Sequence, residues 1–255
     1  MIKDHPVMTT LVDGDRLWRF VDFTKFVSML DSNALFFTRC DRLADKYEGT
    51  YSRPTFESER QLLTSMSNMP RELIKSHLPR TESLMRRRIF LNCWHINEFE
   101  SAAMWHLYLK SDEGVAIQTT FKRLRESLSE CPLDIYATKV QYLDYDQHAM
   151  PFDNALIPYT SKRLSFQHER EMRLIFLDIA KEPIKDGGTF EDLPFNFDPS
   201  APGCPIAVDL DKLIERVFVA PSLDPWIDPL VKNVMKRYGI EKDVVKSDIN
   251  GAPLR

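Results

Sequence analysis

Residues 169–177, which read EREMRLIFL, constrain the fold more than any other stretch of this chain. Successive side chains of a strand point to opposite faces of its sheet. One face of this stretch is apolar throughout and carries Met172, Leu174 and Phe176. The opposite face changes from charged to apolar and carries Glu169, Glu171, Arg173, Ile175 and Leu177. The pattern predicts a strand that is buried on both faces at its far end and opens onto a polar space at its start.

The rest of the chain mixes strand and helix patterns without strict β-α alternation. Short apolar or alternating runs predict strands at 16–21, 34–39, 89–94, 114–119, 135–143, 206–208, 216–219 and 244–245. Apolar residues at helical spacing predict helices at 23–30, 56–88, 98–110, 154–164 and in a last stretch that Gly239 ends. Pro70 and Pro79 are expected to break the second of these helices, and the proline-rich residues 181–205 are expected to form a long loop. The elements together predict an α+β fold with a mixed, largely antiparallel central sheet and flanking helices.

Length and composition set further limits. The chain has 255 residues, of which 43% are hydrophobic and 28% charged, as in soluble proteins with a substantial core. We expect a single domain over 1–255, because the strand-helix-strand tail at 206–255 is too short to hold a large core of its own. A formal charge of −4 gives no global attraction to nucleic acid or membranes. No apolar stretch approaches the roughly 18 residues of a membrane span.

Several classes of chemistry lack their motifs. The four cysteines do not fall at metal-knuckle spacing, and the histidines form no H-E-x-x-H pattern, so no metal site is expected. Walker loops, G-x-G-x-x-G and G-x-S-x-G are absent, which argues against kinases, Rossmann dehydrogenases and α/β-hydrolases. The N-terminus has no apolar signal region, so we expect a reduced, cytoplasmic protein.

The order of several short motifs resembles a widespread bacterial family of domains of unknown function. In chain order the motifs are LWRF, LFFTR, DRLADKYEG, CWHINEFESAAMWHLYLKSDEGVAI and KRLSFQHEREMRL, over about 17–220. They correspond to the family's LYKY-type start, FFS-type strand, NDPFE-like turn, MW-x-x-Y helix and K…E-x-E-x-R strand. The turn at 44–48 departs from the pattern, because Lys46 stands where the family usually has proline. The family brings no settled activity with it.

A second similarity, at the level of short motifs, is to ADP-ribosyltransferases of the Arg-Ser-Glu class. In that class an arginine on the first strand holds a cofactor phosphate, and a serine or threonine on the second shapes the nicotinamide pocket. The second glutamate of an E-x-E motif on a later strand is catalytic. The matching positions here are Arg19, Thr38 and the pair Glu169 and Glu171. The resemblance implies a split sheet and NAD as substrate.

The chemistry of these positions is coherent. NAD hydrolysis or ADP-ribosyl transfer passes through an oxocarbenium-like ribose, which a neighbouring carboxylate stabilises. Two glutamates at i and i+2 on a strand, Glu169 and Glu171, reach the same ligand, and their crowding separates their pKa values. Arg19 can pair bidentately with a pyrophosphate. We therefore expect an ADP-ribosyltransferase or NAD glycohydrolase acting on an unknown macromolecular acceptor, in a bacterial toxin or phage-defence setting.

Two other interpretations stay open. An aromatic and histidine concentration at 94–108 forms either a core or a pocket wall, in which Trp105, Tyr108 and His95 contact a cofactor base. With the arginine run at 86–88, it also suits a non-catalytic domain that binds a nucleotide, nucleic acid or protein. A pocket without a carboxylate would favour that interpretation. The third interpretation is a metal-independent nuclease that uses His95, His168 or Glu171, marked by an arginine-rich groove leading to a histidine.

Overall fold

The computed structural model describes residues 2–66, 71–108, 113–179, 192–221, 225–247, 249 and 251, and for 66 and 71–78 the backbone alone. The strands are β1 (Ile2–Lys3), β2 (Arg16–Asp22), β3 (Ala34–Arg39), β4 (Ile89–Ile96), β5 (Gly114–Thr120), β6 (Ile135–Lys139), β7 (Gln141–Leu143), β8 (Ser161–Arg163), β9 (Glu171–Leu177), β10 (Gly203–Ala207), β11 (Arg216–Val219) and β12 (Asp243–Lys246). The α-helices are α1 (Phe23–Ser32), α2 (Arg53–Met66), α3 (Arg71–Arg88), α4 (Ala102–Tyr108), α5 (Phe121–Ser127), α6 (Leu210–Leu213) and α7 (Ile227–Arg237). Short 3-10 turns are η1 (Cys40–Arg42), η2 (Ile157–Tyr159) and η3 (Leu164–Glu169).

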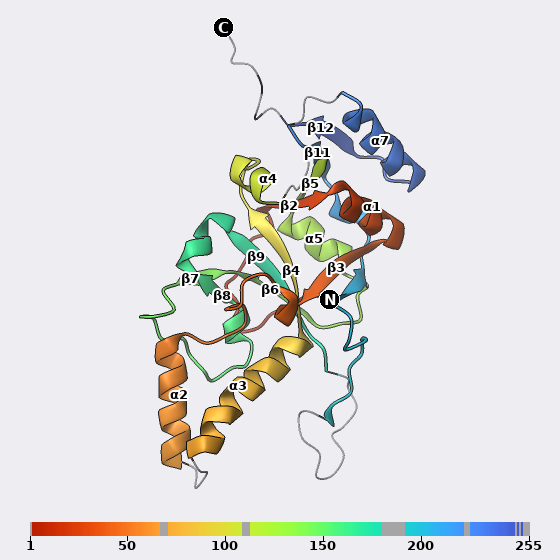
Figure 1. Cartoon of the computed structure of the whole chain (residues 1–255). Coiled ribbons are helices and arrows are strands. Elements are labelled where there is room, and N and C mark those ends of the chain that lie inside the picture. The colour runs from red at the N-terminus through yellow and green to blue at the C-terminus, as the bar shows by residue number, and fades with distance from the viewer. Residues whose placement is uncertain are drawn as a thin grey trace.

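One large sheet organises the described part of the chain. Its strands follow the order β1-β6-β9-β4-β2-β5-β11-β12, with β3 and β10 attached beside β4. The pairs β1–β6 and β11–β12 are parallel and the other pairs of this sheet are antiparallel. Strands β7 and β8 form a separate small sheet next to it, and α2 and α3 project together away from the strands (Figure 1). The α+β prediction with a mixed, largely antiparallel sheet is confirmed.

The large sheet forks at β4. One edge of β4 pairs with β9 from Ile89 to His95. The other edge is shared, because β3 pairs with it near Phe90 and β2 pairs with it near Ile96. We call β3 with β10 one arm of the fork and β2 with β5 the other arm. Helix α1 connects β2 to β3 and therefore joins the two arms. Between these two contacts, no strand of the described part of the chain pairs with the middle of β4 along this edge, and a gap opens in the sheet.

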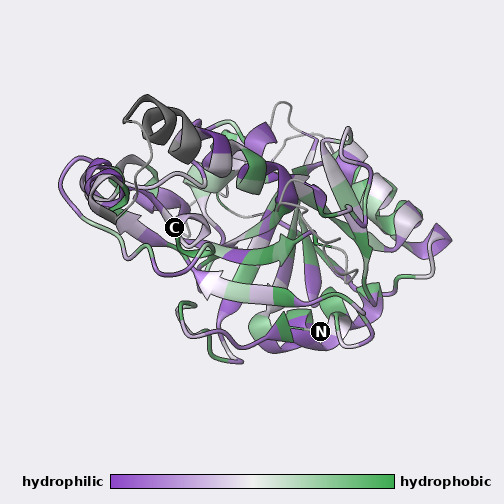
Figure 2. Cartoon of the chain, turned by 90° about the horizontal axis from the view of Figure 1, so that it is seen from below, coloured by the Kyte–Doolittle hydropathy of each residue, from purple (hydrophilic) through white to green (hydrophobic). Residues whose placement is uncertain are grey.

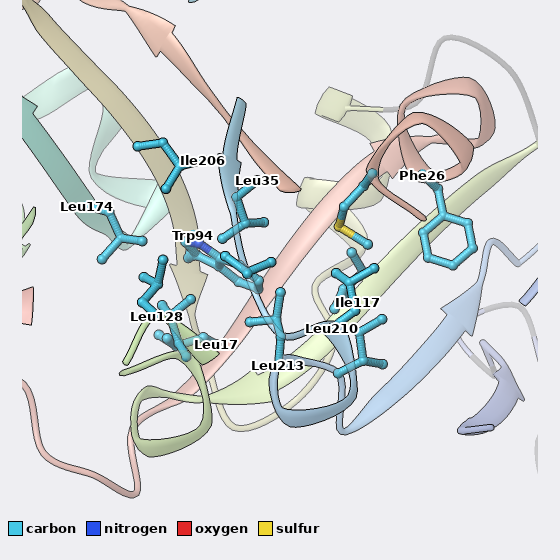
Figure 3. Close-up of a cluster of buried hydrophobic side chains, with 14 of the residues drawn as sticks. Leu17, Phe26, Leu35, Trp94, Ile117, Leu128, Leu174, Ile206, Leu210 and Leu213 are labelled. Carbon is cyan, nitrogen blue, oxygen red and sulfur yellow. The ribbon is translucent and has the colours of Figure 1, made fainter. Parts of the chain in front are cut away.

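The main core lies on one face of the sheet, under α1, α5, α6 and α7. It joins side chains from both arms and from the helices, including Leu17, Leu35, Trp94, Ile117, Leu174 and Leu213 (Figure 3). Each such side chain contributes about 1.5–3 kcal/mol when fully buried. Coloured by hydropathy, the chain has its hydrophobic residues gathered along the central strands (Figure 2). This core fixes the two arms relative to each other and keeps the gap between them open.

Local capping explains why α1 ends where it does. The Asp22 carboxylate accepts a hydrogen bond from the backbone N–H of Lys25 at 2.9 Å, which is a typical N-cap. Asn33 takes the left-handed conformation with φ of 48° and closes the helix, as its residue type permits. The short linker places β3 directly after the helix, so the two arms of the fork begin close in sequence.

Some sequence predictions were wrong at the level of single elements. Residues 135–143 form two strands, β6 and β7, that belong to different sheets. Residues 154–164 hold a 3-10 turn and the strand β8 where a helix was predicted, and Pro79 lies inside α3 without ending it. Strand β10 begins at Gly203, within the predicted loop 181–205, whose residues 181–191 lie outside the described part. Pro70 also lies outside it.

The tail at 206–255 contributes β11 and β12 to the edge of the large sheet through pairing of β11 with β5. This pairing is consistent with the expected single domain, which stays a prediction. In the described residues, no helix combines the length and the apolar character needed to cross a membrane.

Candidate active site

A cavity of about 840 Å³ occupies the fork of the sheet. Ligand sites for small molecules usually measure about 300–1,000 Å³. Its walls come from both arms, from α1 and α4, from β4, and from the segment that carries η3 and β9. The polar residues that line it include Arg19, Thr38, Asp45, Glu48, His95, Tyr108, Lys162, Glu169 and Glu171. The structure thus brings Arg19, Thr38 and the two glutamates, which come from separate segments, around one space.

Arg19 lies at the fork itself. Its guanidinium Nη1 donates a hydrogen bond of 2.8 Å to the backbone carbonyl of Cys93, in the middle of β4. It also lies over the ring of Trp94, 5.7 Å from the ring centroid. No carboxylate in the described part of the chain forms a salt bridge with it. Burial lowers the pKa of this guanidinium, yet arginine stays charged in proteins. A cation without an anionic partner at a cavity wall suits an anionic ligand group such as a phosphate.

A buried cluster of charges forms the opposite wall. Lys162 Nζ lies 3.0 Å from Glu48 Oε1, 2.7 Å from Glu169 Oε2 and 3.3 Å from Glu171 Oε2. Arg173 is fully buried, and its Nε lies 2.7 Å from Glu171 Oε1. The same guanidinium reaches Glu48 Oε2 at 2.7 Å through Nη2. Three carboxylates therefore share two cations in a space with little water, where such interactions are strong.

The environments of the two glutamates differ. Burial alone would raise the pKa of Glu171, but Arg173 and Lys162 outweigh it and lower the pKa to about 2. Burial raises the pKa of Glu169, and Lys162 offsets this effect only partly. Glu171 is therefore an anion at neutral pH, while Glu169 is the carboxylate of the pair that takes up a proton more readily. Pairs whose environments separate their pKa values are typical of acid and base roles.

The position of Glu169 corrects the strand prediction. Strand β9 begins at Glu171, and Glu169 ends the turn η3. Arg170 between them takes the left-handed conformation with φ of 40°, so the two glutamates are not neighbours on one strand face. Lys162 nevertheless contacts both carboxylates. The prediction that Arg173 shares the face of Glu171 is confirmed, although this face is buried rather than solvated.

His95 connects β4 to the glutamate segment. Its Nδ1 lies 2.6 Å from the backbone carbonyl of Glu169, so Nδ1 carries the proton and donates it. Burial lowers the pKa of His95, which favours the neutral ring. The other nitrogen, Nε2, is buried and has no hydrogen-bond partner among the residues that the structure describes. Tyr108, at the end of α4, lines the cavity and is 44% exposed.

Trp105 does not line the cavity. It is buried against Trp18, Phe20 and Met104, and its Nε1 donates to Glu100 Oε2 at 2.9 Å. These are the contacts of a core residue that supports α4. The arrangement therefore does not provide the contact between Trp105 and a cofactor that the sequence analysis predicted.

The arginine run at 86–88 does not form a free cationic patch at Arg88. The Arg88 side chain is buried, and its guanidinium donates to the backbone carbonyls of Asp178, Leu193 and Pro194. It also lies over the ring of Phe195, at 3.9 Å from the centroid. Arg88 therefore holds these backbone segments together, and its guanidinium is not exposed to bind nucleic acid as the sequence analysis predicted.

Two cavity residues of the charge cluster escaped the sequence predictions. Glu48 comes from the turn at 44–48, whose motif resemblance was the one available signal for it. Lys162 comes from β8, a three-residue strand of the sequence SKR without any apolar pattern, and its one signal was its place at the start of the motif KRLSFQHEREMRL. In the same region Asp45 lines the cavity and binds Arg163 at 2.7 Å.

The site bears differently on the two alternative interpretations. A binding module was expected to have a pocket without a carboxylate, but this cavity is lined by Asp45, Glu48, Glu169 and Glu171. For the nuclease interpretation, His95 and Glu171 line the cavity and His168 does not, and Arg19 is the one arginine among the described lining residues, so they do not form an arginine-rich groove. Among the described residues, no group of three or more His, Cys, Asp or Glu side chains is placed to hold a metal ion.

Comparison with known proteins adds little to this geometry. No protein-family model matches the sequence, and no curated protein matches it significantly. Among solved structures, the chain is similar to DarT of Thermus sp. 2.9 in complex with ADP-ribosylated ssDNA, with a TM-score of 0.40 and 9% identity. The match covers 94% of this chain and 97% of that chain. The resemblance to a bacterial domain of unknown function stays a prediction.

Proposed function

We propose that this protein binds NAD in the forked cavity and transfers ADP-ribose to an acceptor, or to water. One observation carries the proposal: Arg19, Thr38, Glu169 and Glu171 line a single cavity although they come from separate segments. Arg19 would hold the pyrophosphate, because it is a cation without a carboxylate partner in the described residues. Thr38 would shape the pocket of the nicotinamide ring, as the motif resemblance implies.

The two glutamates would divide the chemistry between them. When the bond between the ribose C1′ and the nicotinamide nitrogen breaks, its electron pair leaves with the neutral nicotinamide. Positive charge then develops on the ribose, and the Glu171 carboxylate, held anionic by Arg173 and Lys162, stabilises it. A hydroxyl of the acceptor, or water, attacks C1′ and gives up a proton. Glu169, whose pKa is raised, is the base suited to receive that proton.

The test is incubation of the pure protein with NAD labelled in the ADP-ribose part, following nicotinamide release and label transfer. Glu171→Gln is expected to lower the rate at least about 100-fold, in line with the loss of a charge that stabilises the transition state. Glu169→Gln is expected to lower it by about 10²–10⁴, the range for a general base. Glu126→Gln, a change of an exposed glutamate on α5, serves as the matched control and should leave the rate unchanged.

Folding of each variant is checked by its melting temperature, because Glu171→Gln weakens a buried ion pair. NAD binding is measured separately through the rise in melting temperature that a ligand of the folded state causes. A wild-type protein that neither releases nicotinamide nor is stabilised by NAD contradicts the proposal. Because the acceptor is unknown, the assay is run with protein, DNA and RNA acceptors as well as with water alone.

The biological setting that we propose is that of a bacterial toxin or defence protein, whose target would be the macromolecular acceptor. The sequence resemblance supports this setting. Expression of the wild type and of Glu171→Gln in the same bacterial host tests it, and toxicity should follow the wild type alone.

A further inference from the structure

Lys162 lies at the centre of the charge cluster, and so far its one role has been to help Arg173 keep Glu171 anionic. Its ammonium group contacts carboxylates from three separate segments: the turn at 44–48, the turn η3 and strand β9. Its side chain is 9% exposed, so it has little contact with solvent. A buried ammonium group is costly unless it is fully paired, and here it donates hydrogen bonds to Glu169 and Glu171 and forms a salt bridge with Glu48.

The fold uses a dedicated element to place this residue. Strand β8 belongs to the small sheet with β7 and not to the large sheet that carries Arg19, Thr38 and Glu171. The neighbouring side chain, Arg163, binds Asp45 and lies over the rings of Tyr47 and Phe166. These contacts fix the backbone on the C-terminal side of Lys162. The ammonium group itself lies 4.7 Å from the centroid of the Phe166 ring.

We infer that Lys162 is a positioning residue, which holds the Glu169 and Glu171 carboxylates in one fixed arrangement at the cavity wall with Glu48 as its anchor. Without it, Arg173 would still bind Glu171 and Glu48, but Glu169 would lose its salt bridge. The two glutamates would then no longer be tied together, because η3 and the left-handed residue Arg170 separate them along the chain. This inference rests on the function proposed above, since it assigns Lys162 to the same pair of glutamates.

Electrostatics point the same way. Lys162 lowers the pKa of both glutamates against the effect of burial, and the surrounding carboxylates raise its own pKa, so it remains a cation. The charged and titratable groups that interact with it are Glu48, Tyr108, Tyr142, Glu169, Glu171 and Arg173, and the Cys93 thiol interacts with Glu171. Of these, the carboxylates are the groups that titrate in the acid range.

The test compares three substitutions. Lys162→Met removes both the charge and the donors, Lys162→Gln removes the charge and keeps donors, and Lys162→Arg keeps the charge. Lys139→Met is the matched control, because Lys139 lies on neighbouring β6, binds Asp15 at 2.9 Å and does not line the cavity. If the Met variant fails to fold, the Gln variant provides the same comparison.

The first measurement is the titration of the glutamate carboxyls by NMR on protein labelled with ¹³C at the glutamate side chain. Lys162→Gln and Lys162→Met should raise the pKa of Glu169 and of Glu171 by about 1–3, the usual effect of losing an opposite charge at this distance. Lys162→Arg and Lys139→Met should leave them close to wild type. Unchanged carboxyl titrations in the Gln and Met variants overturn the inference, whether or not the protein turns over NAD.

The second measurement is the pH dependence of NAD turnover. The acid limb of kcat should move to higher pH in the Gln and Met variants and return in the Arg variant. Their kcat should fall at least about 10-fold while KM stays within about threefold, because the carboxylates act in the transition state more than in binding. Equal losses in all three variants, with no movement of the acid limb, overturn the positioning role. A wild type without any turnover contradicts the proposed function instead, and the carboxyl titrations still decide the role of Lys162.

Discussion

Replacing Arg173 by methionine tests the charge cluster most directly. Arg173 is fully buried, binds Glu171 at 2.7 Å and Glu48 at 2.7 Å, and donates to the backbone carbonyl of Tyr159 at 3.1 Å. Methionine fills much of the same space but leaves Glu48 and Glu171 with Lys162 as their remaining cation. Removing one partner of a buried ion pair usually costs about 3–5 kcal/mol.

The pKa of Glu171 shows how much the charges around it stabilise the folded protein. Its value of about 2 lies below the ordinary value of 4.5. That difference corresponds to roughly 3 kcal/mol at neutral pH, at about 1.4 kcal/mol per pKa unit. This energy is the net effect of burial, Arg173 and Lys162 together, so the expected size follows from the loss of a buried ion-pair partner: Arg173→Met should lower the free energy of unfolding by about 3–5 kcal/mol at pH 7.

The assay is urea unfolding followed by tryptophan fluorescence. With a slope of about 3 kcal/mol per molar urea, the midpoint should fall by about 1–2 M. Arg53→Met is the control, because Arg53 and Asp146 form an exposed pair at 3.1 Å, which is worth about 0–1 kcal/mol.

The decisive comparison is the difference in unfolding free energy between wild type and Arg173→Met, measured as a function of pH. Because the folded-state pKa of Glu171 is lowered, its stabilising effect is complete above pH 4.5 and is lost as the pH falls toward 2. The difference between wild type and Arg173→Met should therefore be largest at pH 5–7 and shrink below pH 4.5. A difference below about 1 kcal/mol at pH 7, or one that is as large at pH 3 as at pH 7, refutes the reasoning.

Three further predictions concern separate parts of the molecule. Arg19→Gln should weaken NAD binding about 10–100-fold, the effect of losing a charge-assisted hydrogen bond, whereas Arg16→Gln on the same strand should not; equal Kd values for the two variants, measured by calorimetry, would remove Arg19 from the site. Gly49→Ala should lower the free energy of unfolding by about 2–4 kcal/mol, because Gly49 has a φ of +72° and the new Cβ would clash with the Tyr159 ring. A urea titration measures this change, and an unfolding midpoint equal to that of the wild type would contradict the close approach. Burial raises the pKa of the Cys40 thiol to about 12. Iodoacetamide at pH 8 should therefore leave Cys40 unmodified in the native protein and label it in urea, which mass spectrometry detects. Rapid labelling of Cys40 in the native protein would refute its burial.

The sequence predicted those parts of the fold whose signal is local. Strands β2, β3, β4 and β5 carry runs of apolar or aromatic residues, and each was predicted within two residues of its observed bounds. Helix α1 combines an apolar stripe with the caps Asp22 and Asn33. Such patterns depend on neighbouring residues alone, which is why they can be recognised without knowledge of the tertiary structure.

The errors arise where the tertiary structure decides. The alternation at 135–143 continues through Val140, yet the Val140 N–H donates to the Glu171 carbonyl and the Gln141 N–H to that of Thr160. The chain therefore passes from one sheet to another without a turn residue. Arg170 takes a positive φ that its residue type does not favour, and this moved Glu169 out of the predicted strand.

The candidate site was predicted in part. Arg19, Thr38, Glu169 and Glu171 were named from short motifs, and the structure brings them to one cavity. Their partners Lys162 and Glu48 stand in the quoted motifs, as the first residue of KRLSFQHEREMRL and the last of the turn at 44–48, but no role could be inferred for them, because neither lies in a segment with an apolar pattern. Arg88 shows the opposite case, since three backbone carbonyls from distant segments occupy a side chain that looked free in the sequence.

The fork at β4 has a consequence for how a ligand is received. In the described part of the chain, the middle of that strand lacks a neighbouring strand on one edge, and side chains connect it to β2 and β3 instead. Arg19 on β2 donates to the Cys93 carbonyl of β4 at 2.8 Å, and the Asn92 side chain of β4 donates to the Phe36 carbonyl of β3 at 2.9 Å. A guanidinium has five N–H donors, so Arg19 can keep this bond and still bind an anion. The floor of the cavity is thus preorganised, and a ligand that enters it need not pay the entropy of ordering the backbone beneath it.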